Sequence, residues 1–304
     1  TYKSHGAEIW QGFQKDGIQN AIDAINKNSA NMPKVWIRYL SNDNLSILVI
    51  EDRGTFGLTG IIPKGDQNYD KLNDDDRWAR FENVGFAKEP KNSGTSLGAR
   101  GQGKLMLMST SSKLIIDGNN TYVNDEDKPT MYYDTLMGDG NYRIGRRQIE
   151  TFDMTLGVEE GEKAILALRK VTDDLLKPLE YVGTRIIILN PREDVVKSLE
   201  NGKIKNTISI DWHPILFDKD IQKRVLGKSN PEYVNIDING NTSSIKPNTK
   251  LSSIILRNDN EQVYWIRRNR TMNYNKKPYK VDFFAAAVPE NDVILENELA
   301  GIGQ

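Results

Sequence analysis

The feature that most limits how this chain can fold is the apolar run LSILVI at Leu45–Ile50. Its length suits one β-strand, and its apolar character predicts a strand at the centre of a sheet. A partner strand is expected at Val35–Leu40, because the polar residues Ser41-Asn42-Asp43-Asn44 that separate the two runs are typical of a turn. The sequence therefore predicts a sheet near the start of the chain.

Composition and charge exclude several kinds of protein. The 304 residues suffice for about two domains, and 38% hydrophobic with 27% charged residues argue for a packed core and against wholesale disorder. The absence of cysteine excludes disulfides and thiolate sites, and only two histidines argue against a histidine-based metal centre or hydrolase triad. A net charge of −1 gives the chain as a whole no attraction to nucleic acid.

Targeting signals are absent from the printed sequence. No apolar run approaches the roughly 20 residues that span a bilayer, so we expect a cytoplasmic protein that does not associate with a membrane. The chain opens at Thr1 and stops at Gln304 without clear start or stop signals, and we expect it to be a fragment of a longer protein.

Further helices and strands follow from periodicity and from glycine, proline and polar punctuation. Helices are predicted at Glu8–Asn28, Lys104–Ser111, Glu162–Arg169 and Thr207–Leu226. Strands are predicted at Lys113–Asp117, Thr130–Tyr133, Gly183–Leu189, Tyr233–Ile238, Ser252–Leu256, Gln262–Arg267 and Val281–Val288. A long loop is predicted at Glu51–Arg100, and the polar stretch Asn190–Asn206 suits a domain boundary. We therefore predict an α+β chain with domains at residues 1–200 and 201–304.

The first motif with chemical potential lies on the first predicted helix. Asp16, Asn20 and Asp23 stand at i, i+4 and i+7 and share one stripe. A carboxylate beside a carboxamide can activate a water molecule and help to hold a magnesium ion. The alternative is an ordinary solvated helix face, which also carries polar stripes.

A second motif, Glu51-Asp52-Arg53-Gly54-Thr55-Phe56-Gly57, directly follows the apolar run. An acid at the end of a strand can accept a hydrogen bond from an adenine amine, and glycines let the backbone pass close to a flat base. The alternative is a strand that ends in a tight turn, which Asp and Gly favour.

The third motif is a glycine-rich segment before a predicted helix, with Gly98, Gly101, Gly103 and Lys104 as its candidate residues. Free backbone amides and the positive end of a helix form a cradle for phosphate. A flexible loop is the alternative. Gly98, Gly103 and Lys104 also fit the spacing of a P-loop, but Leu105 replaces the required hydroxyl residue and no buried strand precedes the segment.

Taken in order, these motifs resemble those of the GHKL ATPases, whose nucleotide-binding unit is the Bergerat fold. The resemblance spans residues 8–190 and ends in a Gly183-Thr184 pair at the start of a predicted strand. It implies a Bergerat-type α/β sandwich followed by a smaller, transducer-like α+β domain. Among GHKL proteins the chain is most similar to the dimeric MutL and MORC-like ATPases.

The resemblance also implies roles for individual residues. Asp16 would orient the attacking water, and Asn20 would coordinate Mg²⁺. Asp52 would bind the adenine amine with support from Thr184, and Asp23 would lie at the pocket. The residues implied to hold the phosphates, or to let the backbone approach the nucleotide, are Gly54, Gly57, Gly98, Gly101, Gly103 and Lys104.

Two departures from the family pattern bear on activity. The base position carries Asp16, whereas gyrase, MutL and the chaperones usually carry glutamate there, so we expect slower hydrolysis or a rearrangement that brings the water closer. Phe56 is an additional residue between the two glycines of the second turn. It would shift the backbone near the adenine.

The expected function is Mg²⁺-dependent ATP binding and hydrolysis that gates dimerisation or a conformational change in a larger, DNA-acting protein of repair or defence. The alternative is a nucleotide-dependent chaperone or binding module with little turnover. A sensor histidine kinase fits poorly, because His5 has too little chain ahead of it for a phosphoacceptor hairpin.

A basic segment near the end of the chain suggests a nucleic-acid contact. Aromatic residues interleave with its cations, a combination that can neutralise phosphates and stack on bases. The alternative is a hairpin with a solvated basic edge. The candidate residues are Arg267, Arg268, Arg270, Lys276 and Lys277.

Overall fold

The computed structural model describes residues 8–24, 33–62, 72–73, 75–82, 107–111, 114–116, 122–124, 131–147, 155–224, 234–239, 245–248, 264–274 and 277–287. The chain divides into two compact units. The first comprises Thr1–Ile208 and Tyr233–Ile245, and the second comprises Ser209–Glu232 and Lys246–Gln304. The predicted boundary between residues 200 and 201 stays a proposal, and the segment 233–245, which the sequence assigned to the second domain, lies in the first unit.

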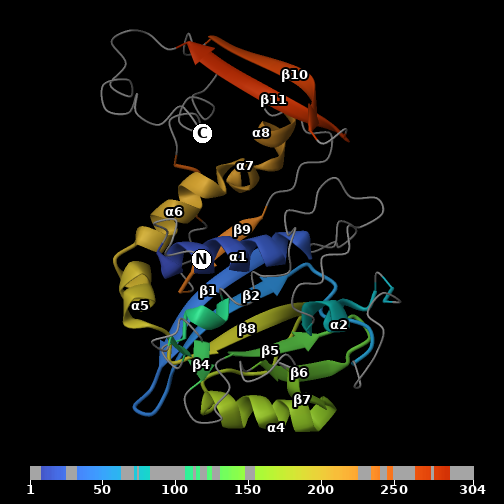
Figure 1. The fold of residues 1–304 in the computed structure, drawn as a ribbon, viewed down its shortest axis with the longest axis vertical. Helices are drawn as coiled ribbons and strands as arrows, with labels where there is room; N and C mark the ends of the chain where they lie inside the picture. The colour runs from blue at the N-terminus through green and yellow to red at the C-terminus, as the bar shows by residue number, and fades with distance from the viewer. Residues whose placement is uncertain are drawn as a thin grey trace. The chain divides into compact units, whose positions relative to one another are not determined.

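A seven-stranded mixed sheet forms the centre of the first unit (Figure 1). Its strands are antiparallel except for β1 and β9, which run parallel although they are far apart in the sequence. The order across the sheet is β7 (Thr155–Glu160), β6 (Tyr142–Arg147), β5 (Met131–Leu136), β8 (Gly183–Leu189), β2 (Ser46–Arg53), β1 (Lys34–Ser41) and β9 (Asn235–Ile238).

Strand β2 occupies an interior position of the sheet, as its apolar run predicted. It pairs with β1 on one side and β8 on the other, and its residues from Ile47 to Asp52 are all buried. The predicted strand ended at Ile50, whereas β2 continues through Arg53. Glu51 and Asp52 therefore lie in the sheet and not in the predicted loop, because antiparallel pairing with β1 extends to the end of β2.

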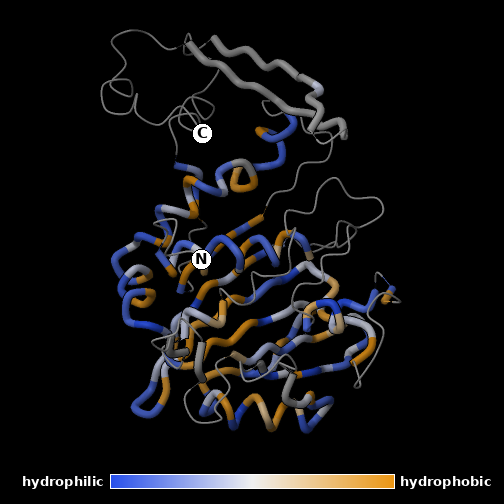
Figure 2. The backbone as a smooth tube through the Cα atoms, viewed as in Figure 1, coloured by the Kyte–Doolittle hydropathy of each residue, from blue (hydrophilic) through white to orange (hydrophobic). Residues whose placement is uncertain are grey.

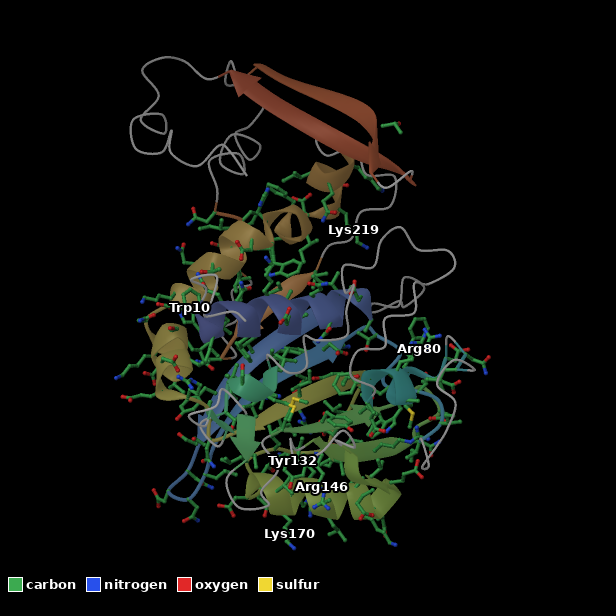
Figure 3. All side chains as sticks on the ribbon, in the orientation of Figure 1. Trp10, Arg80, Tyr132, Arg146, Lys170 and Lys219 are labelled. Carbon is green, nitrogen blue, oxygen red and sulfur yellow. The ribbon has the colours of Figure 1, made fainter. Side chains whose placement is uncertain are left out.

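Helices cover both faces of this sheet. Helix α1 (Ile9–Asp23) packs on one side, where a Cβ atom added at Gly17 would lie 2.1 Å from Ile50 Cδ1. Helix α4 (Gly161–Thr172) packs on the other side, against a core that includes Ile47, Val49, Ile144 and Ile187. Figure 3 labels Trp10 on α1 and Lys170 on α4, on opposite sides of the sheet.

Because neighbouring residues of a strand point to opposite faces, this packing assigns every residue of β2 to a side. Ile50 and Asp52 belong to the face under α1, which is called the α1 face below. Val49 and Glu51 belong to the face under α4, the α4 face. Figure 2 shows apolar residues along the strands of this sheet. Along α4 it shows apolar residues that alternate with polar ones.

Helix α2 (Arg77–Glu82) lies inside the segment predicted as a loop. It is held by aromatic packing: the ring centroids of Trp78 and Phe81 lie 5.1 and 4.8 Å from that of Tyr133. The Tyr133 hydroxyl also donates a hydrogen bond of 2.6 Å to Glu82 Oε1. A six-residue helix fixed by distant contacts has too little periodicity to be read from sequence.

The remaining elements agree only in part with the predictions. The predicted helix Thr207–Leu226 is broken into three, with Pro214 near the start of the middle one. The remaining described helices and strands are β3 (Leu114–Ile116), β4 (Tyr122–Asn124), α5 (Glu193–Glu200), α6 (Lys203–Asp211), α7 (His213–Leu216), α8 (Lys219–Arg224), β10 (Tyr264–Tyr274) and β11 (Lys277–Ala287). The predicted strand Ser252–Leu256 lies outside the described residues.

The predicted α+β class is confirmed by this mixture of helices with a seven-stranded mixed sheet. In the second unit, the described residues form short helices and the two-stranded ribbon of β10 and β11. Within the described parts of the chain, no helix has the length and apolar character needed to cross a membrane.

Candidate functional site

A buried carboxylate, that of Asp52, lies on the α1 face near the end of β2. Asp52 is buried, with only 8% of its surface exposed. The hydroxyl of Thr55 donates a hydrogen bond of 2.6 Å to Asp52 Oδ1, and the backbone N–H of Thr184 donates one of 2.9 Å to the same oxygen. In the part of the chain that the structure describes, both bonds end on Oδ1, which leaves Oδ2 for another donor.

Burial also changes the acidity of Asp52. Loss of solvent raises the pKa of its carboxyl from 3.8 to about 7, although the hydrogen bonds from Thr55 and Thr184 lower it and the charge of Glu51 adds a small increase. The carboxylate is thus only partly compensated by its two donors. A third donor, supplied by a ligand, would stabilise the ionised form further.

A tight turn follows this carboxylate. Gly54 and Gly57 have φ angles of 82° and 71°, in the region that L side chains rarely adopt. A Cβ atom at Gly57 would lie 2.8 Å from the carbonyl oxygen of Leu136. The additional residue of this turn, Phe56, is 38% exposed, and the Arg77 guanidinium lies 4.2 Å from its ring centroid.

Thr135 joins this turn to strand β8, a role that the sequence analysis missed. Its hydroxyl accepts a hydrogen bond of 2.9 Å from the N–H of Leu58 and donates one of 2.7 Å to the carbonyl of Gly183. Close contact also requires Gly183 itself, because a Cβ atom there would lie 2.1 Å from the Asp52 carbonyl oxygen. The predicted strand stopped at Tyr133, so no local signal pointed to Thr135.

Helix α1 brings the first motif to the same face of the sheet. Gly17 lies against Ile50, and Ile50 precedes Asp52 by two residues on β2. Gly17 also directly follows Asp16 on α1. Asp16 and Asn20 are half-buried, whereas Asp23 is exposed. Gly17, which the sequence alone did not single out, allows this close packing of the helix on the sheet.

A metal ion at this site would need oxygen atoms from a bound nucleotide as well as from the protein. Among the described residues, no group of three His, Cys, Asp or Glu side chains can hold a metal ion. Mg²⁺ commonly takes one or two protein oxygens and completes its shell with phosphate and water. The half-buried carboxamide of Asn20 fits that limited role.

The glycine-rich motif lies outside the described residues, and so do Gly98, Gly101, Gly103 and Lys104. The described chain resumes at Leu107, which is fully buried and begins the helical residues 107–109. Its Cδ2 atom would lie 3.6 Å from a Cβ atom at Gly17. Leu107, three residues after Lys104, therefore packs where α1 meets β2.

The predicted nucleic-acid residues lie on the ribbon of β10 and β11, apart from Lys276, which is outside the described residues. Directly paired residues share a face of a two-stranded ribbon. Arg268 pairs with Phe283, Arg270 with Val281 and Tyr274 with Lys277, and these positions share one face. Arg267, paired with Phe284, belongs to the opposite face together with Lys280.

Comparisons with known proteins give structural neighbours only. No family model and no curated protein sequence matches the chain. Its structure is similar to that of the ATPase region of Saccharomyces cerevisiae topoisomerase II, at 10% identity and a TM-score of 0.45 over 86% of this chain and 59% of that one. It is also similar to the ATPase and transducer domains of DNA topoisomerase II from Balamuthia mandrillaris, at 9% identity and 0.45 over 86% and 56%. The chain thus spans less than two thirds of either neighbour.

The raised pKa of Asp52 predicts how stability depends on pH. An acid that titrates near 3.8 when unfolded and near 7 when folded binds more protons in the folded state between these values. Its contribution to the free energy of unfolding is therefore complete below pH 3.8 and is lost as the pH rises through about 7.

Urea unfolding between about pH 4 and about pH 8 tests this dependence. Asp52→Asn keeps the shape of the side chain but does not titrate, so its stability should fall less with rising pH than that of the native chain. Glu162→Gln, on the exposed surface of α4, is the matched control and should leave the native profile unchanged. Identical profiles for native protein and Asp52→Asn would contradict the prediction.

Proposed function

We propose that this chain binds ATP with Mg²⁺ and hydrolyses it in the manner of the GHKL ATPases. The observation that carries the proposal is the buried carboxylate of Asp52: among the described residues, Thr55 and Thr184 hold its Oδ1, and its Oδ2 is left for a donor. An adenine base offers such a donor in its 6-amine. A buried, incompletely compensated acceptor favours a ligand that supplies the missing hydrogen bond.

The residues of helix α1 complete the proposed site. Its Asn20 side chain would coordinate the cation, and Asp16 would hold the attacking water as general base. Bound Mg²⁺ neutralises phosphate charge during phosphoryl transfer. Gly17 supports this assignment because it lets α1, which carries both residues, pack directly on the strand that carries Asp52.

Roles for the remaining predicted residues belong to the same proposal. Gly101, Gly103 and Lys104 would hold the phosphates, with Gly98 at the start of their loop. The buried position of Leu107, shortly after this loop, supports a phosphate site next to α1. Asp23, which is exposed, would contact the pocket only at its margin.

Binding of a non-hydrolysable ATP analogue tests the site. Calorimetry should detect Mg²⁺-dependent binding to the native chain and a loss of about tenfold or more for Asp52→Asn, because a charged acceptor contributes about 1.5–3 kcal/mol. Asp16→Asn should bind the analogue but lower ATP turnover by about 100-fold or more. Glu162→Gln serves as the control for both measurements. Analogue binding that is equal in native protein and Asp52→Asn would contradict the assignment of the base pocket.

A binding module with little turnover is the alternative form of this function, and the short side chain of Asp16 favours it. Turnover by Asp16→Glu separates the two forms. A marked gain over the native chain would mean that the shorter carboxylate limits hydrolysis and would favour the binding module. Turnover that Asp16→Asn abolishes and Asp16→Glu does not increase would favour the ATPase.

We further propose that ATP binding drives dimerisation or a conformational change in a longer, cytoplasmic protein. Such coupling requires that ATP and ADP bind two conformations with different affinities. Sedimentation should therefore show a larger or more compact species with Mg²⁺ and the ATP analogue than with ADP. Equal sedimentation with both nucleotides would contradict the coupling.

A second candidate function is DNA binding by the ribbon of β10 and β11. The register favours it because Arg268, Arg270 and Lys277 fall on one face together with the aromatic positions Tyr274 and Tyr279. Cations that follow a phosphate backbone and aromatic rings that stack on bases are the usual means of holding single-stranded DNA.

A pair of double variants with equal charge change tests this candidate. Arg268→Glu with Arg270→Glu should weaken binding of a fluorescent single-stranded oligonucleotide about tenfold or more and reduce its dependence on salt. Arg267→Glu with Lys280→Glu, on the opposite face, is the matched control and should weaken binding much less. Equal losses in the two variants, or no loss in either, would contradict a specific DNA-binding face.

A further inference from the structure

A buried charged cluster lies on the α4 face, behind the carboxylate of Asp52. Glu51 on β2, Arg185 on β8 and Asp134 on β5 form one row across three adjacent strands, because Arg185 pairs with each of the other two in the register. Their side chains are 6%, 3% and 0% exposed. A cluster of charges this deeply buried must be compensated almost entirely by its own members.

Arg185 makes most of these compensating contacts. Its Nε donates a hydrogen bond of 3.0 Å to Asp134 Oδ1, and its Nη2 donates one to Asp134 Oδ2, so the pair is bidentate. Its Nη1 donates a bond of 3.0 Å to the carbonyl of Lys177 and lies 3.7 Å from Glu51 Oε2. One guanidinium thus joins β2, β5, β8 and the segment that precedes β8.

Two further side chains complete the cluster. The hydroxyl of Tyr142, on β6, donates a hydrogen bond to Asp134 Oδ2, and Arg38, on β1, donates one to Glu51 Oε2. Two carboxylates therefore face two guanidinium groups. Loss of the Arg185 guanidinium would leave both carboxylates buried with Arg38 as their remaining cation within this cluster.

The cluster is joined to the proposed base pocket through the backbone. Glu51 directly precedes Asp52, and Arg185 directly follows Thr184, whose N–H holds Asp52 Oδ1. Adjacent residues of a strand point to opposite faces, so the same two strand segments carry the cluster on one face and the pocket on the other. A change in the separation of β2 and β8 at Arg185 would alter the hydrogen bond from Thr184 to Asp52.

We infer that Arg185 is a positioning residue for nucleobase recognition: it holds β2 and β8 so that Asp52 Oδ2 faces the 6-amine of the base. This inference rests on the proposed ATP site. Lysine cannot replace arginine here, because an ammonium group lacks the planar fork that binds Asp134 through two nitrogens while a third reaches Lys177.

Two nucleotides that differ only at the 6-position separate positioning from general stability. ATP carries the 6-amine, and purine riboside triphosphate carries hydrogen there while keeping the sugar and the phosphates. Arg185→Lys should lose about tenfold in affinity for ATP and keep its affinity for purine riboside triphosphate within about twofold. Arg192→Lys, which removes a fork from a surface ion pair with Asp194, is the matched control and should change neither affinity.

A milder variant keeps the test decisive if Arg185→Lys does not fold. Tyr142→Phe removes one hydrogen bond to Asp134 without removing charge, and it should lower the affinity for ATP alone by about two- to fivefold. Thermal unfolding of each variant checks that the protein is folded at the temperature of the titration.

The outcomes distinguish this inference from the function on which it rests. Equal affinities of the native chain for the two nucleotides would overturn recognition of the 6-amine by Asp52, and the positioning role with it. A native chain that prefers ATP, together with variants that lose both nucleotides equally or lose neither, would overturn the positioning role alone.

Discussion

The carboxylate of Asp52 is buried near the end of the interior strand β2, and the rest of the proposed site depends on that burial. Removing a carboxylate from water costs several kcal/mol unless hydrogen bonds replace its hydration. Thr55 and Thr184 supply two such bonds, both to Oδ1, and the pKa of about 7 indicates that they do not fully replace water. A ligand that donates a hydrogen bond to Oδ2 would offset part of this cost. We propose that ATP is such a ligand.

The surrounding architecture keeps this carboxylate in place from three directions. Gly17 allows α1 to lie directly on β2, Gly183 allows β8 to pass within contact of the Asp52 backbone, and Thr135 joins the following turn to β8. From the opposite face, Arg185 joins the strands by its contacts with Glu51 and Asp134. The sheet thus separates the proposed binding chemistry on one face from the charged cluster on the other.

Local patterns were sufficient to predict the elements that build this site. The apolar run of β2 and the periodicity of α1 and α4 have local causes, and the predicted strand Gly183–Leu189 has the same bounds as β8. Asp52 could be singled out because an acid stands at the end of the apolar run, and Thr184 was named through the resemblance to the GHKL motifs.

Features that depend on contacts between distant parts of the sequence could not be predicted. Strand β9 joins β1 across about 200 residues, and nothing in its four residues indicates that partner. Thr135 and Arg185 have their roles only through residues that neighbouring strands bring beside them. The short helix α2 depends on the ring of Tyr133 and not on its own sequence pattern.

A crystal structure of the chain with a non-hydrolysable ATP analogue and Mg²⁺ tests the central claim most directly. We expect the adenine 6-amine to lie within hydrogen-bond distance of Asp52 Oδ2, with Asn20 as a ligand of the cation and Asp16 facing the terminal phosphate. A base bound elsewhere, or an Asp52 carboxylate that makes no contact with the nucleotide, would contradict it.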